Sequence, residues 1–296
     1  MDSLQTLIEN LELDSSLRQP DRLRERIDAL DLLEVHLLSR HEPVDSAAAR
    51  RNAELDRRAE AVRTRLEADN AGLYASLRSD IRRGLGADRL LALLPRPRDD
   101  GTIECARGES YDYLDELVSG ILELAPPEAA NTDLTSEMVR YQPTPARHIF
   151  DLIARTRLGE DDVLVDLGSG LGHVPLLAAI CTGARTVGVE LEASYVKCAR
   201  RCAEALNLER ATFIRQDARS ADFSTGTVFY LYTPFTGSIL RAVLDSLRRQ
   251  AEIREIRVCA YGPCVPTVAE EKWLVADGPV ESGRVSAFRA TGLSVK

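Results

Sequence analysis

The sequence predicts an α/β protein in which a helical N-terminal region precedes a largely parallel β-sheet. In the first hundred residues, apolar side chains recur at helical spacing, as at Leu4, Ile8 and Leu11. In the second half of the chain, short apolar runs alternate with amphipathic segments of about 10–15 residues, a spacing typical of βαβ units. The two patterns predict a helical domain over residues 1–140 and a sheet domain over residues 141–296.

Two further helices are expected in the N-terminal domain. Residues 46–68 are rich in Ala, Arg, Glu and Leu, which predicts a long and mostly solvated helix. The arginine-rich face of this helix leaves a partner surface open as the alternative. Residues 111–124 predict another helix, which Pro126 and Pro127 end. We expect the domain to serve as a lid, or as a substrate or partner region.

The sheet domain is expected to alternate strands and helices along its whole length. Apolar runs predict strands within residues 162–170, 185–192, 211–218, 227–235, 253–262, 272–278 and 284–292. Amphipathic segments predict helices over residues 147–158, 173–183, 193–208 and 238–252. The first four strands are each followed by polar or glycine residues, where ligand-binding groups of such sheets are found.

The composition is that of a globular protein without a membrane span or a secretory signal. Hydrophobic residues make up 44% and charged residues 29% of the chain. No apolar run approaches the roughly 20 residues that a bilayer requires, and the first residues are acidic and amphipathic. A cytoplasmic location is therefore expected. The six cysteines have no zinc-ligand spacing, so buried thiols and no metal site are expected.

The charge is concentrated in the first half of the chain. Residues 1–145 contain 29 acidic residues and 19 arginines, and the whole chain carries a net charge of −9. Because acidic surfaces repel phosphate backbones, nucleic acid is disfavoured as a partner. A basic partner and a simple solubility role both stay open, as does the oligomeric state.

The strongest motif joins an apolar strand to a glycine-rich turn. Val163-Leu-Val-Asp166-Leu-Gly168-Ser-Gly170-Leu-Gly172 is followed directly by a helix. Glycines at such a turn let the backbone approach a ligand, and the helix start offers free N–H groups. The spacing is GxGxG rather than the GxGxxG of dinucleotide sites. A carboxylate two residues before the first glycine suits a ligand that carries an ammonium group.

Three more segments end strands at the same expected edge of the sheet. Glu190, at the end of the next strand, can accept hydrogen bonds from both ribose hydroxyls. Asp217, in Gln216-Asp-Ala218, can accept one from an adenine amino group. The fourth segment is Tyr230-Leu-Tyr-Thr-Pro-Phe235.

With these four segments in this order, the chain resembles the class I AdoMet-dependent methyltransferases, whose sheet is Rossmann-like and seven-stranded. AdoMet is S-adenosylmethionine, and S-adenosylhomocysteine is the product. The resemblance covers about residues 140–290 and implies strand order 3-2-1-4-5-7-6 with an antiparallel seventh strand. The cofactor-binding residues that we expect are Asp166, Gly168, Ser169, Gly170, Gly172, Glu190, Gln216, Asp217, Ala218, Tyr232, Tyr141 and Thr144.

A narrower resemblance concerns the non-SET histone-lysine methyltransferases and their bacterial relatives. It is carried by YDYLDELV from Tyr111, by YQPTP over residues 141–145 and by DLGSGLGHV. In that group, a helical region and a loop before the core close over the cofactor. The fourth-strand motif of that group carries Asn, whereas this chain has Thr233, so lysine specificity stays open.

The acceptor is therefore expected to be a small molecule or a protein side chain. Tyr232, Thr233 and Tyr141 are the expected catalytic, substrate-side residues. His173 is expected to cap or pack at its helix start rather than act as a base. The alternatives are a non-catalytic AdoMet-binding or scaffold protein and an NAD(P)-dependent oxidoreductase; the GxGxG spacing and Asp217 disfavour the oxidoreductase.

Overall fold

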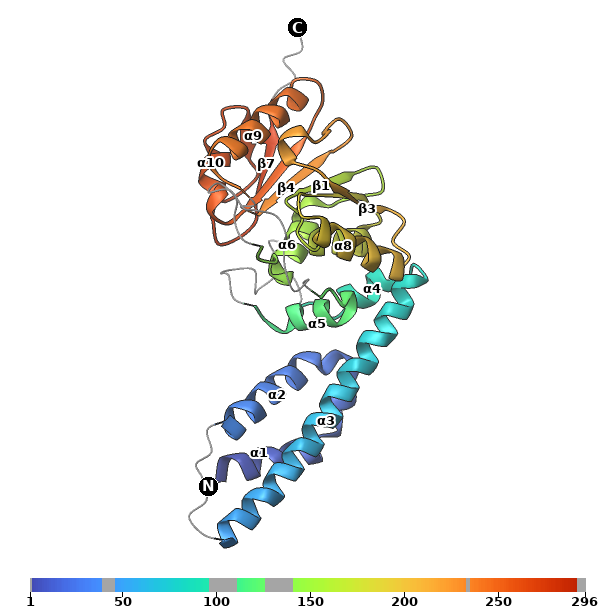
Figure 1. Cartoon of the computed structure of the whole chain (residues 1–296), viewed down its shortest axis with the longest axis vertical. Coiled ribbons are helices and arrows are strands. Elements are labelled where there is room, and N and C mark those ends of the chain that lie inside the picture. Colours follow the sequence, from blue (N-terminus) through green and yellow to red (C-terminus); the bar gives the residue numbers. More distant parts are fainter. Residues whose placement is uncertain (1, 39–45, 96–110, 126–140, 233–234, 292–296) are drawn as a thin grey trace. The chain divides into compact units, whose positions relative to one another are not determined.

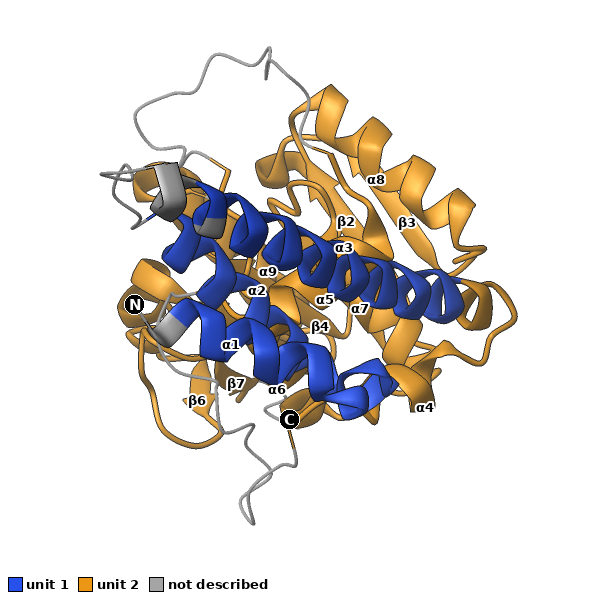
Figure 2. Ribbon diagram, turned by 90° about the horizontal axis from the view of Figure 1, so that it is seen from below, with its two compact units in different colours: residues 1–78 blue, residues 79–296 orange. Residues whose placement is uncertain are grey.

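The computed structural model describes residues 2–38, 46–95, 111–125, 141–232 and 235–291 (Figure 1). By compactness the chain divides into two units, Met1–Arg78 and Ser79–Lys296 (Figure 2). No helix among the described residues is both long and apolar enough to cross a membrane. The same residues contain no cluster of three or more His, Cys, Asp or Glu that could hold a metal ion.

The first unit is built from three helices, as its apolar spacing predicts. They are α1 (Asp2–Leu13), α2 (Leu23–Leu38) and α3 (Ser46–Arg82), of which α3 crosses into the second unit. The predicted 46–68 helix is thus confirmed but continues further. Its side chains are mostly exposed, with one buried stripe that includes Ala59, Val62 and Leu66. That stripe packs with Leu4, Ile8, Leu11, Leu17, Ala29 and Leu33 into one apolar core.

A buried arginine ties the turns of this unit to its long helix. Two 3₁₀ turns, Ser15–Arg18 and Pro20–Arg22, connect α1 to α2. Arg26, only 1% exposed, donates from Nε to Asn70 Oδ1 at 2.5 Å. Its Nη1 donates to the carbonyls of Leu17 at 2.8 Å and Gln19 at 2.6 Å. These bonds offset part of the cost of burying the guanidinium, whose pKa is lowered mainly by desolvation.

Two helices that lie before residue 140 belong to the compact unit of the sheet. They are α4 (Gly86–Leu91), which the sequence did not predict, and α5 (Tyr113–Leu122), which it did. α4 packs against α7 (His173–Thr182), and α5 packs against α6 (Ala146–Thr156). Compactness therefore separates the chain after Arg78, and the boundary at residue 140 stays a prediction about domains. The prolines expected to end α5 lie outside the described residues.

The second unit contains the predicted seven-stranded sheet. Its order is β3-β2-β1-β4-β5-β7-β6, with β7 antiparallel to both of its neighbours. This confirms the Rossmann-like order implied by the resemblance. The strands are β1 (Val163–Leu167), β2 (Arg185–Glu190), β3 (Ala211–Arg215), β4 (Val228–Tyr232), β5 (Arg257–Tyr261), β6 (Leu274–Ala276) and β7 (Ser286–Ala290).

Helices cover both faces of the sheet. Figure 1 shows α6 and α8 (Ala193–Ala205) on one side of the strands and α9 (Gly237–Ala251) on the other. Val163, Val165 and Leu167 of β1 alternate toward the α9 side and join its apolar core, as strand geometry requires. A short helix, α10 (Val265–Ala269), follows β5 and was not predicted. Asp166 alternates with those residues and therefore faces the α6 side.

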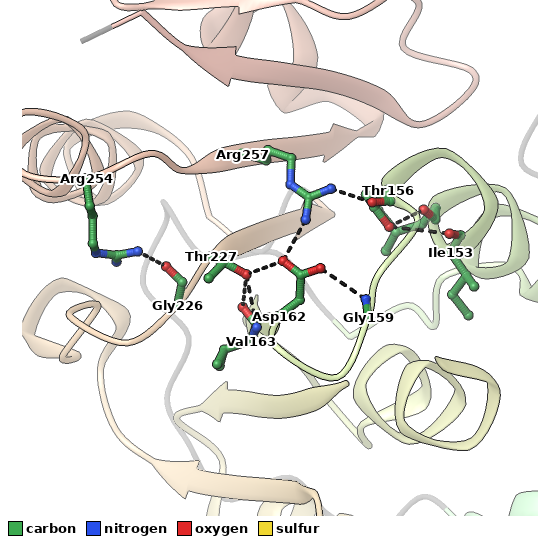
Figure 3. Close-up of polar contacts among 10 residues, drawn as sticks. Ile153, Thr156, Gly159, Asp162, Val163, Gly226, Thr227, Arg254 and Arg257 are labelled. Atoms are coloured by element: carbon green, nitrogen blue, oxygen red, sulfur yellow. Dashed lines mark hydrogen bonds and ion pairs between the residues drawn. The ribbon is translucent and has the colours of Figure 1, made fainter. Parts of the chain in front are cut away.

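A polar network fixes the amino ends of three parallel strands (Figure 3). The Asp162 carboxylate accepts from Thr227 Oγ1 at 2.8 Å, Arg257 at 2.7 Å and the Gly159 amide at 3.0 Å. Arg257 also donates to the Thr156 carbonyl at the end of α6. Burial pushes the pKa of Asp162 upward, but these donors outweigh it and lower the pKa. The network joins β1, β4 and β5 at the end of the sheet opposite the glycine turn.

Candidate functional site

The turn after β1 has a backbone that only glycine adopts easily. Gly168, Gly170 and Gly172 have φ angles of 82°, 52° and 87°, in the left-handed region. The amides of Gly168 and Ser169 both donate to the Val189 carbonyl, at 2.8 and 3.0 Å. The turn is thereby pinned to the end of β2, and α7 begins directly after it at His173.

Glu190 closes this turn from the end of β2. Its Oε2 accepts from the Gly170 amide at 2.8 Å, and its Oε1 accepts from the Glu192 amide at 2.8 Å. A carboxylate oxygen has two acceptor sites, so each oxygen keeps one for a ligand hydroxyl. The geometry therefore leaves Glu190 able to accept from a diol.

Asp166 is a buried carboxyl group in β1. Its side chain is 4% exposed, and its register neighbours are Gly188 on β2 and Tyr230 on β4. Burial, reinforced by the negative charge of Glu190, raises the pKa of Asp166 well above its ordinary value. A cation placed beside it would stabilise the ionised form. This is the chemistry expected of a site for an ammonium group.

A hydroxyl in the middle of the turn is also available. Ser169 is 8% exposed, and its buried Oγ has no hydrogen-bond partner among the described residues. A Cβ at Gly188 would lie 2.6 Å from this Oγ, so glycine in β2 is needed to seat the serine. A buried hydroxyl without a partner costs free energy, which a polar ligand group would recover.

The ring of Tyr141, from the segment before α6, lies against the glycine turn at Gly170. A Cβ at Gly170 would come within 2.2 Å of its ring. The Tyr141 hydroxyl lies 3.2 Å from His173 Nδ1, and its ring centroid lies 5.1 Å from that of Tyr195. Burial lowers the pKa of His173 to about 4 and raises that of Tyr141, so the pair consists of a neutral imidazole and a protonated phenol. His173 thus contacts Tyr141 at the start of α7 but does not cap the helix.

Thr144 comes from the same loop and reaches the sheet. Its Oγ1 lies 3.3 Å from the hydroxyl of Tyr230, and both residues are buried. Burial raises the pKa of Tyr230 well above its ordinary value, so the phenol stays protonated. The structure therefore brings Thr144, Tyr141, the glycine turn and Asp166 to one end of the sheet.

The predicted adenine-side residues follow β3, beside Glu190. The Gln216 amide donates to the Glu190 carbonyl at 3.0 Å, and its side chain donates to the Ser220 carbonyl at 2.8 Å. The Asp217 carboxylate is held by Arg219, whose amide donates at 2.9 Å and whose guanidinium donates at 2.6 Å. These bonds outweigh burial and lower the pKa of Asp217. Ala218 begins a 3₁₀ turn and packs against the α9-side core.

The side on which the sequence predicts the acceptor contains the ends of β4 and β5. Tyr232 stacks on Tyr261, with ring centroids 4.6 Å apart and planes at 29°. The ring centroid of Tyr261 also lies 4.2 Å from that of His148. Thr233, predicted on this side, lies outside the described residues. Sequence reasoning missed Tyr261 and Arg219, because each acts through a partner that only the fold or a local turn brings near.

Comparison with known families finds a match over the part of the chain that contains the glycine turn. Residues 135–227 match a family model described as "Histone methylation protein DOT1". Two relatives from Cryptococcus neoformans var. neoformans serotype D, strains JEC21 and B-3501A, are 46% identical over 56 residues. Each is named "Histone-lysine N-methyltransferase, H3 lysine-79 specific". The match spans 18% of this chain and only 9% of each relative. These matches confirm the predicted methyltransferase class for this segment.

Solved methyltransferases are also similar to the sheet unit. An RNA methyltransferase from Salinibacter ruber in complex with S-adenosyl-L-homocysteine is 26% identical, with a TM-score of 0.43. The similarity covers 52% of this chain and 97% of that one. A precorrin-6y C5,15-methyltransferase from Geobacter metallireducens GS-15 is 17% identical over 53% of this chain and 93% of that one, with a TM-score of 0.40. At TM-scores this low, neither similarity bears on the acceptor.

Proposed function

We propose that this chain is an AdoMet-dependent methyltransferase whose acceptor is an amine of a protein side chain. The assignment of the cofactor rests on one observation: Asp166, the Gly168–Gly172 turn and Glu190 meet at the carboxyl ends of β1 and β2. The family match over residues 135–227 supports the acceptor class, because the matched relatives are named for a histone lysine. The predicted cytoplasmic location stays a prediction.

The described residues fit the cofactor group by group. Asp166 would hold the ammonium, and the unpartnered Oγ of Ser169 would offer a hydrogen bond to the methionine part. Glu190 would accept hydrogen bonds from the ribose hydroxyls. Asp217 would accept one from the adenine amino group, sharing its carboxylate oxygens between that group and Arg219. The chemistry supplied by the bound cofactor is an electrophilic methyl group on a sulfonium, with S-adenosylhomocysteine as the product.

The residues at the ends of β4 and β5 support an amine acceptor. Tyr232, which is partly exposed and stacks on the buried Tyr261, is an aromatic ring that would attract a cation. A protonated amine must lose its proton before it attacks a methyl group. Because burial keeps the phenols of Tyr141 and Tyr230 protonated, these side chains would serve as hydrogen-bond donors and packing surfaces rather than as bases. We therefore infer that the proton leaves to solvent and that catalysis relies on alignment.

Two measurements on the full-length chain test this proposal. Calorimetric titration with AdoMet and with NAD is expected to show binding of AdoMet alone. Incubation with methyl-labelled AdoMet, first with purified core histones and then with a desalted cell extract, is expected to label protein on lysine. NAD binding without AdoMet binding would refute the cofactor. Label confined to small molecules would refute the acceptor class.

Matched variants connect the binding to the named residues. Glu190→Ala removes the acceptor that holds the Gly170 amide and is expected to weaken AdoMet binding by about 1–3 kcal/mol. The exposed Glu209→Ala is the control and is expected to leave the affinity unchanged. Equal affinities of the two variants would contradict the assignment of Glu190.

A further inference from the structure

The first turn of α5 holds the loop that carries Tyr141 at three points. The Tyr111 hydroxyl donates to the Pro143 carbonyl at 3.0 Å. Asp115 Oδ1 accepts from the Ala146 amide at 2.8 Å. Arg147 donates to Asp112 Oδ2 at 3.4 Å. The contacts fall on Pro143 in the 141–145 loop and on the first two residues of α6, Ala146 and Arg147.

Asp115 is the central contact because it caps two helices at once. Its Oδ2 accepts from the Asp112 amide at 2.8 Å and completes a capping box at the start of α5. α6 follows Pro145, which forms no side-chain cap, so its first amide depends on Oδ1 of Asp115. A carboxylate is favoured at a helix N-terminus by the macrodipole, and this one lies at two such ends.

The loop that is anchored in this way reaches the cofactor site within a few residues. Tyr141, five residues before Ala146, has its ring against Gly170, and Thr144 lies beside the hydroxyl of Tyr230. We propose that Asp115 is a positioning residue of the cofactor site: through the Ala146 amide it holds Tyr141 over the glycine turn. This inference rests on the proposed function, because the benefit of the position is binding of AdoMet.

The conservative variant Asp115→Asn changes the hydrogen bonds of this side chain while keeping its size. A carboxylate accepts at both oxygens, whereas an amide accepts at one and donates at the other. In Asp115→Asn, the side-chain NH2 group would therefore face the backbone N–H of either Ala146 or Asp112. Both groups are hydrogen-bond donors, so that bond cannot form. The helix start loses a bond while the volume of the side chain stays the same.

The test is AdoMet titration of the full chain for wild type, Asp115→Asn, Tyr141→Ala and the double variant. Asp115→Asn is expected to weaken binding about tenfold, as loss of one partly buried hydrogen bond to a charged group predicts. The double variant is expected to be no weaker than Tyr141→Ala alone by more than about twofold, because both changes act through one ring. Equal affinity of Asp115→Asn and wild type, or full additivity with Tyr141→Ala, would overturn the proposal.

A control and a second variant separate positioning from loss of folding. Asp162→Asn also removes a partly buried carboxylate, but at the other end of β1, and is expected to lower the melting temperature without changing the AdoMet affinity. Tyr111→Phe removes the exposed bond to the Pro143 carbonyl and is expected to weaken binding about twofold. A Tyr111→Phe chain that binds more weakly than Asp115→Asn would contradict the central place of Asp115.

A ligand-free readout distinguishes failure of this inference from failure of the proposed function. In hydrogen exchange, the amides of residues 141–149 are expected to exchange faster in Asp115→Asn than in wild type, and unchanged exchange would overturn the anchoring. A wild-type chain that does not bind AdoMet would refute the proposed function. A wild-type chain that binds, with an Asp115→Asn chain that binds equally well, would refute only this inference.

Discussion

Two aspartates at opposite ends of β1 have opposite electrostatic surroundings. Asp162, at the amino end, is met by a hydroxyl, an amide and a guanidinium, which lower its pKa despite burial (Figure 3). Asp166, at the carboxyl end, is more deeply buried, and burial and the charge of Glu190 raise its pKa. The same residue type, four positions apart, is thus electrostatically satisfied at one end and unsatisfied at the other.

This difference separates stability from function along one strand. A buried carboxylate whose donors are all present stabilises the fold, because removing it leaves those donors unpaired. A buried carboxylate kept near its neutral form costs stability, and a perturbed pKa of this kind marks a functional site when a ligand can repay that cost. We therefore expect changes at the two ends to affect different measurements.

The largest effect is expected from Gly170→Ala. Its left-handed backbone disfavours a side chain, and the new Cβ would stand 2.2 Å from the ring of Tyr141. AdoMet affinity is expected to fall by about 2–4 kcal/mol in a calorimetric titration. Gly159→Ala, where a Cβ would meet nothing within 4 Å, is the matched control. Similar affinities for both variants would mean that the turn does not contact the ligand.

A smaller loss of binding is expected from Asp166→Asn. The amide cannot offer a negative charge to an ammonium, so AdoMet affinity is expected to fall by about 2 kcal/mol. Stability is expected to stay the same or to rise, because a desolvated carboxyl beside Glu190 is removed. Thermal unfolding of the ligand-free chain checks the second part, and a clear loss of stability would contradict it.

The raised pKa of Asp166 also predicts how AdoMet binding depends on pH. Since an ammonium favours the ionised carboxylate, affinity is expected to rise with pH until Asp166 is ionised without ligand, and binding below that point releases a proton. Ligand-free stability due to this group falls over the same range, because the folded state holds the proton more tightly. Titrations in two buffers of different ionisation enthalpy measure the proton release. In Asp166→Asn the release from this group should vanish.

Asp162→Asn is expected to act on stability alone. The new side-chain NH2 would face either the Gly159 amide or both Arg257 and Thr227, which share Oδ1, and should lower the free energy of unfolding by about 1–2 kcal/mol. Because the pKa of Asp162 is lowered on folding, its contribution is present above its unfolded pKa and disappears as pH falls through its folded pKa. Denaturant titration at neutral and acid pH checks this. A difference that grows on acidification would be inconsistent with the pairing.

The smallest effect is expected from Tyr141→Phe. The ring stays on Gly170, while the hydroxyl loses its contact with His173 at 3.2 Å and its hydrogen bond with the Leu171 backbone. AdoMet affinity is expected to fall by about 0.5–1 kcal/mol, measured by the same titration. A loss as large as that of Gly170→Ala would show that the hydroxyl itself contacts the ligand.

The comparison also shows which features the sequence could predict. The strand order and the glycine turn were predictable, because βαβ spacing and the order of Asp166, the glycines and Glu190 are local patterns. The contact of Asp115 with Ala146 was not, because it joins residues that are 31 positions apart in the sequence. The Arg219 contact to Asp217 is local, yet nothing in its spacing distinguishes it from an exposed arginine.

One experiment tests the separation of function from stability most directly: AdoMet titration and thermal unfolding of Asp162→Asn and Asp166→Asn side by side. We predict that Asp166→Asn loses AdoMet affinity while keeping its melting temperature. Asp162→Asn is predicted to keep its AdoMet affinity and to have a lower melting temperature. If Asp166→Asn bound AdoMet as tightly as wild type, or if both variants lost affinity and stability together, the account would be contradicted.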